Sequence, residues 1–225
     1  MTAPLSIEAV PLAGPGASAL SLTVAAHQTV ALVGGEDSRL ASLGAYVLGL
    51  DPLPGGRILV FGTAVADLPE PERLAFRRRV GYLPAGEGLI QNLSLRDNVA
   101  LPLRFGATAT PREIDGRVSV ILAAARVREV ADLRPAQVGS ADRRRAAFAR
   151  ALAFDPALLV LERPFDGLSL TTAAELLEFA RGGETAEGAR RAILIIASEL
   201  PSGLRTRVEH LYRVGRGGLL QPEAA

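Results

Sequence analysis

The segment 29–42 has the pattern of a site for a phosphate-bearing ligand. An apolar, β-rich run at 29–33 leads into a glycine-containing turn and then into a helical pattern. In a phosphate-binding loop of this kind, backbone N–H groups surround the phosphates, a lysine neutralises the outer ones and a Ser/Thr hydroxyl binds magnesium. Leu40 stands at the lysine position, and the chain contains no lysine. The pattern therefore predicts a phosphate-binding fold that has lost its main cation.

Other positions of this loop have also changed. Gly34 keeps the first glycine of the motif, whereas Asp37 and Arg39 occupy the positions of the other two. Two like charges held close together cost on the order of several kcal/mol at an effective dielectric near 20, so Asp37 disfavours a polyphosphate. Arg39 has a planar fork and a shifted position, which make it a poor replacement for lysine. The degenerate loop consists of Gly34, Gly35, Asp37, Ser38, Arg39, Leu40, Ala41 and Ser42, with Ala41 and Ser42 in place of the Ser/Thr pair.

Composition excludes several classes of site. Absence of cysteine excludes disulfides, thiolate metal sites and cysteine nucleophiles, and the two distant histidines, His27 and His210, argue against a histidine-built metal centre. A net charge of +1, from 25 basic and 24 acidic residues, gives no drive toward nucleic acid. Apolar runs are far shorter than the roughly 20 residues that span a bilayer. We expect a cytoplasmic protein that reaches a membrane only through a partner.

The 225 residues, 48% of them hydrophobic, are enough for one large α/β domain. Two β-rich segments, 20–24 and 29–33, look like a strand pair ahead of the loop. Segment 10–17 is the most loop-like part of the chain. Further strands are expected at 57–62, 80–83, 157–161, 193–197 and, at a sheet edge, 208–214. Helices are expected at 38–48, 69–79, most of 94–131, 143–153 and 171–181.

Strands alternate with helices in the second half of the chain. Continuous apolar strands such as 157–161 and 193–197 are typical of a parallel sheet that is buried on both faces. The sequence thus predicts a single α/β domain over 1–225 with a mostly parallel sheet. It also predicts an antiparallel β part near the N-terminus and an inserted helical subdomain at about 89–150.

The order of these segments resembles the ATP-binding subunit of an ABC transporter from residue 21 to about 218. Three blocks in the family's order carry the resemblance: 81–83, 97–104, and 144–156 followed by 158–168. Two of them look most like the Mla-type subfamily, which powers lipid trafficking between membranes. The resemblance implies a P-loop NTPase fold with a RecA-like core, a dimer of ATP-binding subunits, and attachment to a permease at the cytoplasmic face of the inner membrane.

The catalytic positions that the resemblance identifies are also altered. Ala85 replaces the Q-loop glutamine, and Ser198 replaces the switch histidine. Glu162 keeps a carboxylate at the Walker B magnesium position, one methylene longer than aspartate, but Arg163 occupies the general-base position and cannot accept a proton. The family's stacking aromatic is missing, because no aromatic residue precedes Tyr46. Glu162 and Arg163 are read either as capping or salt-bridge residues or, for Arg163, as a cation poised for an anion.

The signature motif, which completes a partner's nucleotide site in this family, is degenerate as well. Asp142 places an anion near a γ-phosphate, and Ser169 replaces the aspartate of the D-loop. The motif corresponds to Val138, Gly139, Ser140, Ala141 and Asp142.

Three functions are compatible with these residues. The leading hypothesis is a catalytically inactive ABC subunit with a structural or regulatory role, paired with an active subunit or with itself, and holding no cofactor. The second is an active ATPase in which Arg39 or Arg163 replaces lysine and Glu162 holds magnesium, so that ATP and magnesium are its cofactors. The third is a cytoplasmic module that binds another anion at helix N-termini and arginines. In this family the helical middle, about 89–134, receives the coupling helices of the permease.

Overall fold

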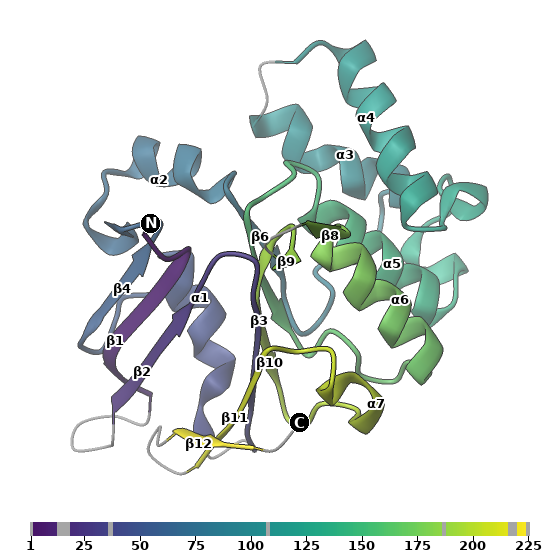
Figure 1. Cartoon of the computed structure of the whole chain (residues 1–225). Helices are drawn as coiled ribbons and strands as arrows, with labels where there is room; N and C mark the ends of the chain where they lie inside the picture. The colour runs from purple at the N-terminus through teal and green to yellow at the C-terminus, as the bar shows by residue number, and fades with distance from the viewer. Residues whose placement is uncertain are drawn as a thin grey trace.

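The computed structural model describes residues 2–12, 19–35, 38–106, 109–185, 188–215 and 220–223. Two larger sheets and a group of helices lie side by side (Figure 1), and β8 and β9 form a separate two-stranded antiparallel sheet. The strands are β1 Leu5–Pro11, β2 Ala19–Val24, β3 Thr29–Val33, β4 Arg57–Val60, β5 Thr63–Ala64, β6 Val80–Leu83, β7 Leu158–Glu162, β8 Glu184–Thr185, β9 Gly188–Ala189, β10 Ala192–Ala197, β11 His210–Val214 and β12 Leu220–Pro222. The helices are α1 Leu43–Val47, α2 Glu70–Arg77, α3 Leu95–Gly106, α4 Pro111–Ala124, α5 Ser140–Ala151, α6 Leu170–Arg181 and α7 Ser202–Arg205.

The central sheet has the order β12-β11-β3-β10-β7-β6, and its strands are parallel from β11 to β6. Every residue of β3, β7 and β10 is buried, as expected for strands covered on both faces. The carboxyl ends of these three strands lead into the loops that carry the predicted site residues. The predicted α/β class with a mostly parallel sheet is confirmed.

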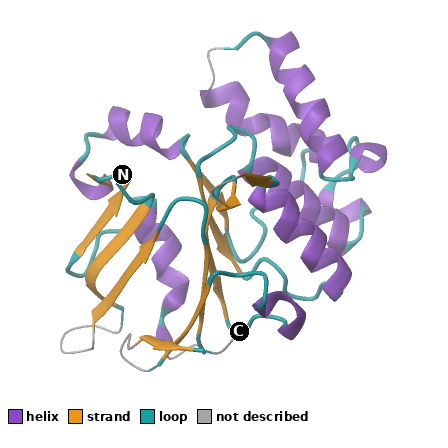
Figure 2. Ribbon diagram, viewed as in Figure 1, coloured by secondary structure: helices purple, strands orange, loops and turns teal. Residues whose placement is uncertain are grey.

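A second sheet, β2-β1-β4-β5, is antiparallel and lies beside α1 (Figure 2). It corresponds to the antiparallel part expected near the N-terminus. The predicted pairing of 20–24 with 29–33 is wrong, because β2 pairs with β1 while β3 joins the parallel sheet. Strand β1 was not predicted from the sequence, and its last residues fall in the segment 10–17, which was predicted to be a loop. Residues 13–17 of that segment lie outside the described part of the chain.

Two further elements differ from the sequence expectation, one in its place in the sheet and one in its length. Strand β11 is not at the edge, because β12 pairs with it antiparallel on the side away from β3. The helix expected at 38–48 is shorter: a 3₁₀ turn at Leu40–Ser42 comes first, and α1 covers only Leu43–Val47. The left-handed backbone of Arg39, with φ of 51°, prevents a regular helix from starting earlier.

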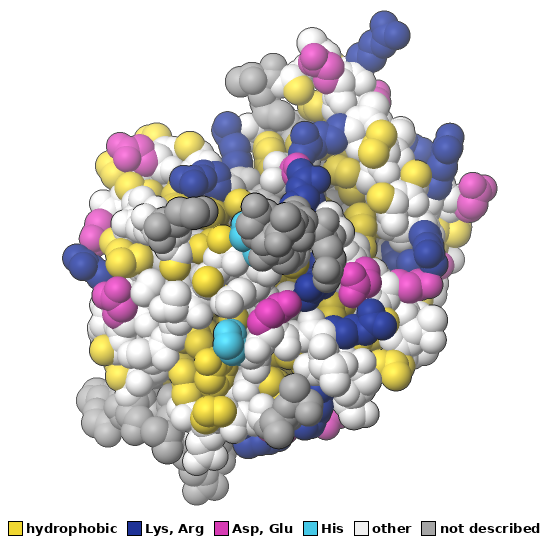
Figure 3. Space-filling model, in the orientation of Figure 1, with side chains coloured by type: hydrophobic (Ala, Val, Ile, Leu, Met, Phe, Trp, Pro, Cys, Tyr) yellow, Lys and Arg dark blue, Asp and Glu magenta, His cyan; other side chains and the backbone are white. Residues whose placement is uncertain are grey.

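Helices α3, α4 and α5 pack together around a small apolar cluster of their own. Thr110 begins α4 with a capping box, in which its hydroxyl accepts from the N–H of Glu113 and the Glu113 carboxylate accepts from the N–H of Thr110 at 2.7 Å. On the face seen in Figure 3, arginine and acidic side chains are interspersed. Among the described residues, no helix is long and apolar enough to cross a membrane.

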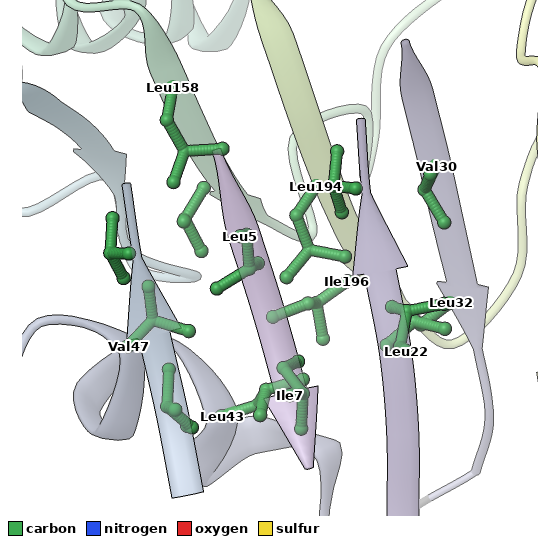
Figure 4. Close-up of a cluster of buried hydrophobic side chains, with 14 of the residues drawn as sticks. Leu5, Ile7, Leu22, Val30, Leu32, Leu43, Val47, Leu158, Leu194 and Ile196 are labelled. Carbon is green, nitrogen blue, oxygen red and sulfur yellow. The ribbon is translucent and has the colours of Figure 1, made fainter. Parts of the chain in front are cut away.

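The main core fills the space between the two sheets. Side chains of the antiparallel sheet, such as Leu5 and Leu22, face Leu194 and Ile196 of the parallel one, with Leu43 of α1 below them (Figure 4). A second cluster covers the opposite face of the parallel sheet beneath α5 and α6. The strand ends that form the site are therefore fixed by burial on both faces.

Candidate functional site

The phosphate-loop segment, residues 34–42, follows β3, and several of its donors have partners within the chain. The N–H of Gly34 donates to the carbonyl of Ala197 at 3.0 Å. Ser38 is buried, and both its N–H and its hydroxyl donate to the carbonyl of Gly35, at 3.0 and 2.5 Å. The two Ser38 donors are thus used within the segment, and the Gly34 N–H is used by the end of β10. Asp37 lies outside the described residues.

Leu40 belongs to the core between the sheets. Its side chain is 4% exposed and is part of the same apolar cluster as Leu43 and Ile196. Arg39, at a position where the motif has glycine, has a left-handed backbone and an exposed side chain. Such a backbone costs a non-glycine residue roughly 1–2 kcal/mol. Leu40, at the predicted lysine position, is thus a packing residue. The neighbouring Arg39 has the strained backbone.

A pocket of about 210 Å³ opens between the phosphate-loop segment and the ends of β6, β7 and β10. It brings together most of the predicted site residues, and Ile196 and Ala197 complete its wall. The predicted residues that line it are Gly34, Gly35, Ser38, Arg39, Leu40, Ala41, Ala85, Glu162, Arg163 and Ser198. The pocket therefore lies where the resemblance expects a nucleotide, but leucine and alanines form much of its wall.

Glu162, the last residue of β7, is only 6% exposed. Its Oε2 accepts from the N–H of Ala85 at 3.3 Å, and its Oε1 has no hydrogen-bond partner of normal geometry in the described part of the chain. Burial raises the pKa of Glu162, against the opposing influence of Tyr82 and of the N–H groups of Ala85 and Gly44. Burial, followed by the charge of Glu162, raises the pKa of Tyr82. The carboxylate is thus enclosed by protein groups.

Arg163 follows the buried Glu162 and carries an exposed guanidinium. Its guanidinium forms an ion pair with Asp166 at 2.6 Å and its side chain is 59% exposed, while its N–H donates to the carbonyl of Ile196 at 2.7 Å. This is the geometry of a salt bridge at a strand end. A guanidinium has no acceptor atom, so it cannot remove a proton from water.

The remaining loop positions have local structural explanations. Ala85 and Ser198 are exposed, and Ala85 has no side-chain amide to orient water. Ser169, at the D-loop aspartate position, caps α6 by accepting from the N–H of Thr172 at 3.2 Å. Buried Leu40 stands where the motif has a lysine, and the Glu162 carboxylate accepts a hydrogen bond from the N–H of Ala85. These residues do not fit a magnesium–nucleotide complex.

The degenerate signature is separate from this pocket. Gly139 and Ser140 are exposed at the start of α5, and Asp142 lies in its first turn. The guanidinium of Arg143 donates to the carbonyl of Val138 at 3.0 Å and fixes the entry to the helix. Residues 138–142, like Ser42, are not among the residues that line the pocket.

Sequence reasoning missed the partners of Glu162. Gly44 in α1 is packed so closely that a Cβ there would lie 2.2 Å from Glu162 Oε1, and 2.8 Å from Cε2 of Tyr82. The longer carboxylate at position 162 was visible in sequence. The sequence signal for this contact was Gly44, a glycine inside the helix that follows the phosphate-loop segment, because a glycine there leaves space for the Glu162 side chain.

Comparisons with known proteins bear on the family and the fold. The family profile described as ABC transporter matches residues 17–166. The chain belongs to the ABC transporter family. The lipoprotein-releasing system ATP-binding protein LolD of Chromohalobacter salexigens is 30% identical over 202 residues, which cover 89% of this chain and 83% of that protein.

Other ABC proteins match over a smaller share of their own length. The methionine import ATP-binding protein MetN 2 of Pseudomonas aeruginosa is 32% identical over 164 residues, 73% of this chain and 49% of that protein. A solved dimeric structure of the ABC transporter cassette MJ0796 has a TM-score of 0.85 at 20% identity, with 97% of each chain covered. The ABC cassette fold thus extends over nearly the whole chain, beyond the residues that the family profile matches.

Proposed function

We propose that this chain is a catalytically inactive ABC ATP-binding subunit with a structural or regulatory role in a membrane transporter. The observation that carries the proposal is the position of Leu40, which is buried in the core where the family needs a lysine. Ala85, Arg163 and Ser198 remove three further groups that act on water or the γ-phosphate. Loss of one transition-state contact costs roughly 3–4 kcal/mol, so their combined loss argues against turnover.

The partner of an inactive subunit is a second ATP-binding subunit. In a dimer with an active chain, one composite site uses the degenerate pocket described above. The other uses only the exposed Gly139 and Ser140 of this chain's signature, next to Asp142. A homodimer has two defective sites, so a heterodimer better explains a working transporter. We place the complex at the cytoplasmic face of the inner membrane.

The permease docks on the helical side of the chain. A groove of about 510 Å³ runs between α2, β6, α3 and α5, and Phe105 and Leu74 on its rim are 84% and 54% exposed. Exposed apolar side chains of this size at a groove are typical of a protein contact. The α3 side of the groove lies within the predicted partner interface at 89–134, and the α2 side extends it.

The cargo follows only from relatives. The name of the LolD relative refers to lipoprotein release, and the motif blocks resemble the Mla type. Both concern lipid-bearing molecules, which supports lipid trafficking as the transport process. Co-purification of untagged partners with this chain would identify the permease and the second subunit.

Nucleotide binding tests the proposal directly. Purified protein is titrated with a fluorescent ATP analogue and magnesium up to millimolar concentration, and phosphate release is followed in parallel. We expect neither saturable micromolar binding nor release above background. Saturable micromolar binding would overturn the proposal, and magnesium-dependent phosphate release by the isolated chain would establish the active ATPase instead.

A further inference from the structure

The buried carboxylate of Glu162 connects three elements. It ends β7, accepts from the N–H of Ala85 in the loop after β6, and packs against Gly44 of α1. Because a Cβ at position 44 would meet Oε1 at 2.2 Å, the carboxylate keeps this position only while residue 44 is glycine. Glu162 therefore bridges the strand ends and α1 through protein contacts alone.

The other side of the same loop, residues 85–88, is held by arginines of α5. Arg150 donates to the carbonyl of Glu87 at 2.8 Å and also to that of Gly88. The Glu87 carboxylate pairs with Arg143 at 3.4 Å and with Arg144 at 3.6 Å, and its side chain is only 16% exposed. The loop is thus attached to α5 by both its backbone and its side chain.

A further contact closes the connection. The guanidinium of Arg144, which is 8% exposed, donates to the carbonyl of Arg163 at 3.0 Å. The N–H of Arg163 in turn donates to the carbonyl of Ile196 in β10. Helix α5, loop 85–88 and the ends of β7 and β10 are therefore cross-linked by hydrogen bonds and ion pairs within the chain.

We propose that Glu162 is a positioning residue that fixes loop 85–88 to the strand ends and, through α5, holds the helical side of the molecule in one orientation. The proposal rests on the proposed function and deepens it, since a subunit that does not turn over ATP needs an internal group to set this orientation. Helix α3, which packs on α5, then presents the docking groove in one fixed form.

Amide hydrogen exchange at Ala85 tests the role of Glu162. In Glu162→Ala, exchange at Ala85 should become at least about fivefold faster, as expected for one lost hydrogen bond. Glu162→Gln should stay near the wild-type rate, because its amide oxygen can accept the same bond. Glu178→Ala, which removes an exposed carboxylate paired with Arg207, is the control and should leave Ala85 unchanged.

An unchanged rate at Ala85 in folded Glu162→Ala overturns the proposal. If that variant does not fold, Gly44→Ala serves instead, because its Cβ must displace the carboxylate, and an unchanged rate there is equally decisive against the proposal. The nucleotide titration separates the two proposals. Saturable ATP binding together with Glu162-dependent exchange overturns only the inactive role, whereas Glu162-independent exchange without ATP binding overturns only the positioning role.

Discussion

The interiors of β3, β7 and β10 and the loops at their carboxyl ends differ in what has been preserved. The strand interiors are fully buried and apolar and form the expected parallel sheet. At the strand ends, positions where the resemblance predicts the charged and amide groups of an ABC site hold residues that pack, cap or pair within the chain. Leu40 joins the core, Ser169 caps a helix and Arg163 pairs with Asp166. The strand interiors thus follow the family's packing, whereas the strand ends are occupied by residues with structural contacts of their own.

Leu40→Lys gives the largest expected effect, because it restores the family's lysine at a buried position. The exchange removes apolar packing and buries an unpaired charge, so we expect a loss of roughly 3–5 kcal/mol in the free energy of unfolding. Phosphate release should remain at background, since Ala85, Arg163 and Ser198 are unchanged. Leu50→Lys, at a side chain that is 54% exposed, is the matched control in urea unfolding. Appreciable turnover in Leu40→Lys would show that the other losses matter less than proposed.

Gly44→Ala tests whether the strand end and α1 are packed around Glu162. Its Cβ would lie 2.2 Å from the carboxylate, so we expect a loss of roughly 1–3 kcal/mol from overpacking. Gly116→Ala, in exposed α4 with open space around its Cβ, should instead stabilise by up to about 1 kcal/mol through helix propensity. Equal effects in the two variants, measured by chemical unfolding, would contradict the packed site.

The sequence predicted the sheet because continuous apolar runs such as 157–161 identify buried strands without reference to their neighbours. It was wrong about β2 and β11, whose partners depend on segments far away in the chain, β1 and β12. The site residues were predicted from the motifs of the family that the chain resembles, and the pocket brings most of them together. Their new roles were not predictable, because the cap at Ser169 and the space at Gly44 depend on three-dimensional contacts.

Glu162→Gln tests the electrostatic cost of the rebuilt strand end. Burial raises the folded-state pKa of Glu162 above the unfolded value, about 4.3, so the folded state keeps a proton that the unfolded chain has released. The free energy of unfolding therefore falls as the pH rises from the unfolded-state pKa of Glu162 to its folded-state pKa. Above the folded-state pKa, wild type carries the full cost of a buried charge. We expect the glutamine variant to gain stability relative to wild type as the pH rises above the unfolded-state pKa of Glu162, because wild type then pays to bury a charge.

A carboxylate at the surface gives the control for this pH dependence. A hydrogen bond from Arg145 holds the pKa of Glu175 below its usual range, so its contribution to stability is present at neutral pH and is lost on acidification. Glu175→Gln should therefore lose stability relative to wild type as the pH rises, the opposite sign. Parallel pH profiles for the two variants, measured by thermal unfolding, would contradict the burial of Glu162.

The smallest effect is expected for Arg163→Glu, which restores a carboxylate at the family's general-base position. The ion pair with Asp166 is largely exposed, so its loss should change the free energy of unfolding by no more than about 1 kcal/mol. Phosphate release should stay at background, because a base is of no use where Leu40 cannot hold a phosphate. Arg163→Gln, which removes the charge without adding a base, is the control. Turnover in Arg163→Glu but not in Arg163→Gln would mean that the pocket still binds nucleotide and that position 163 alone had silenced it.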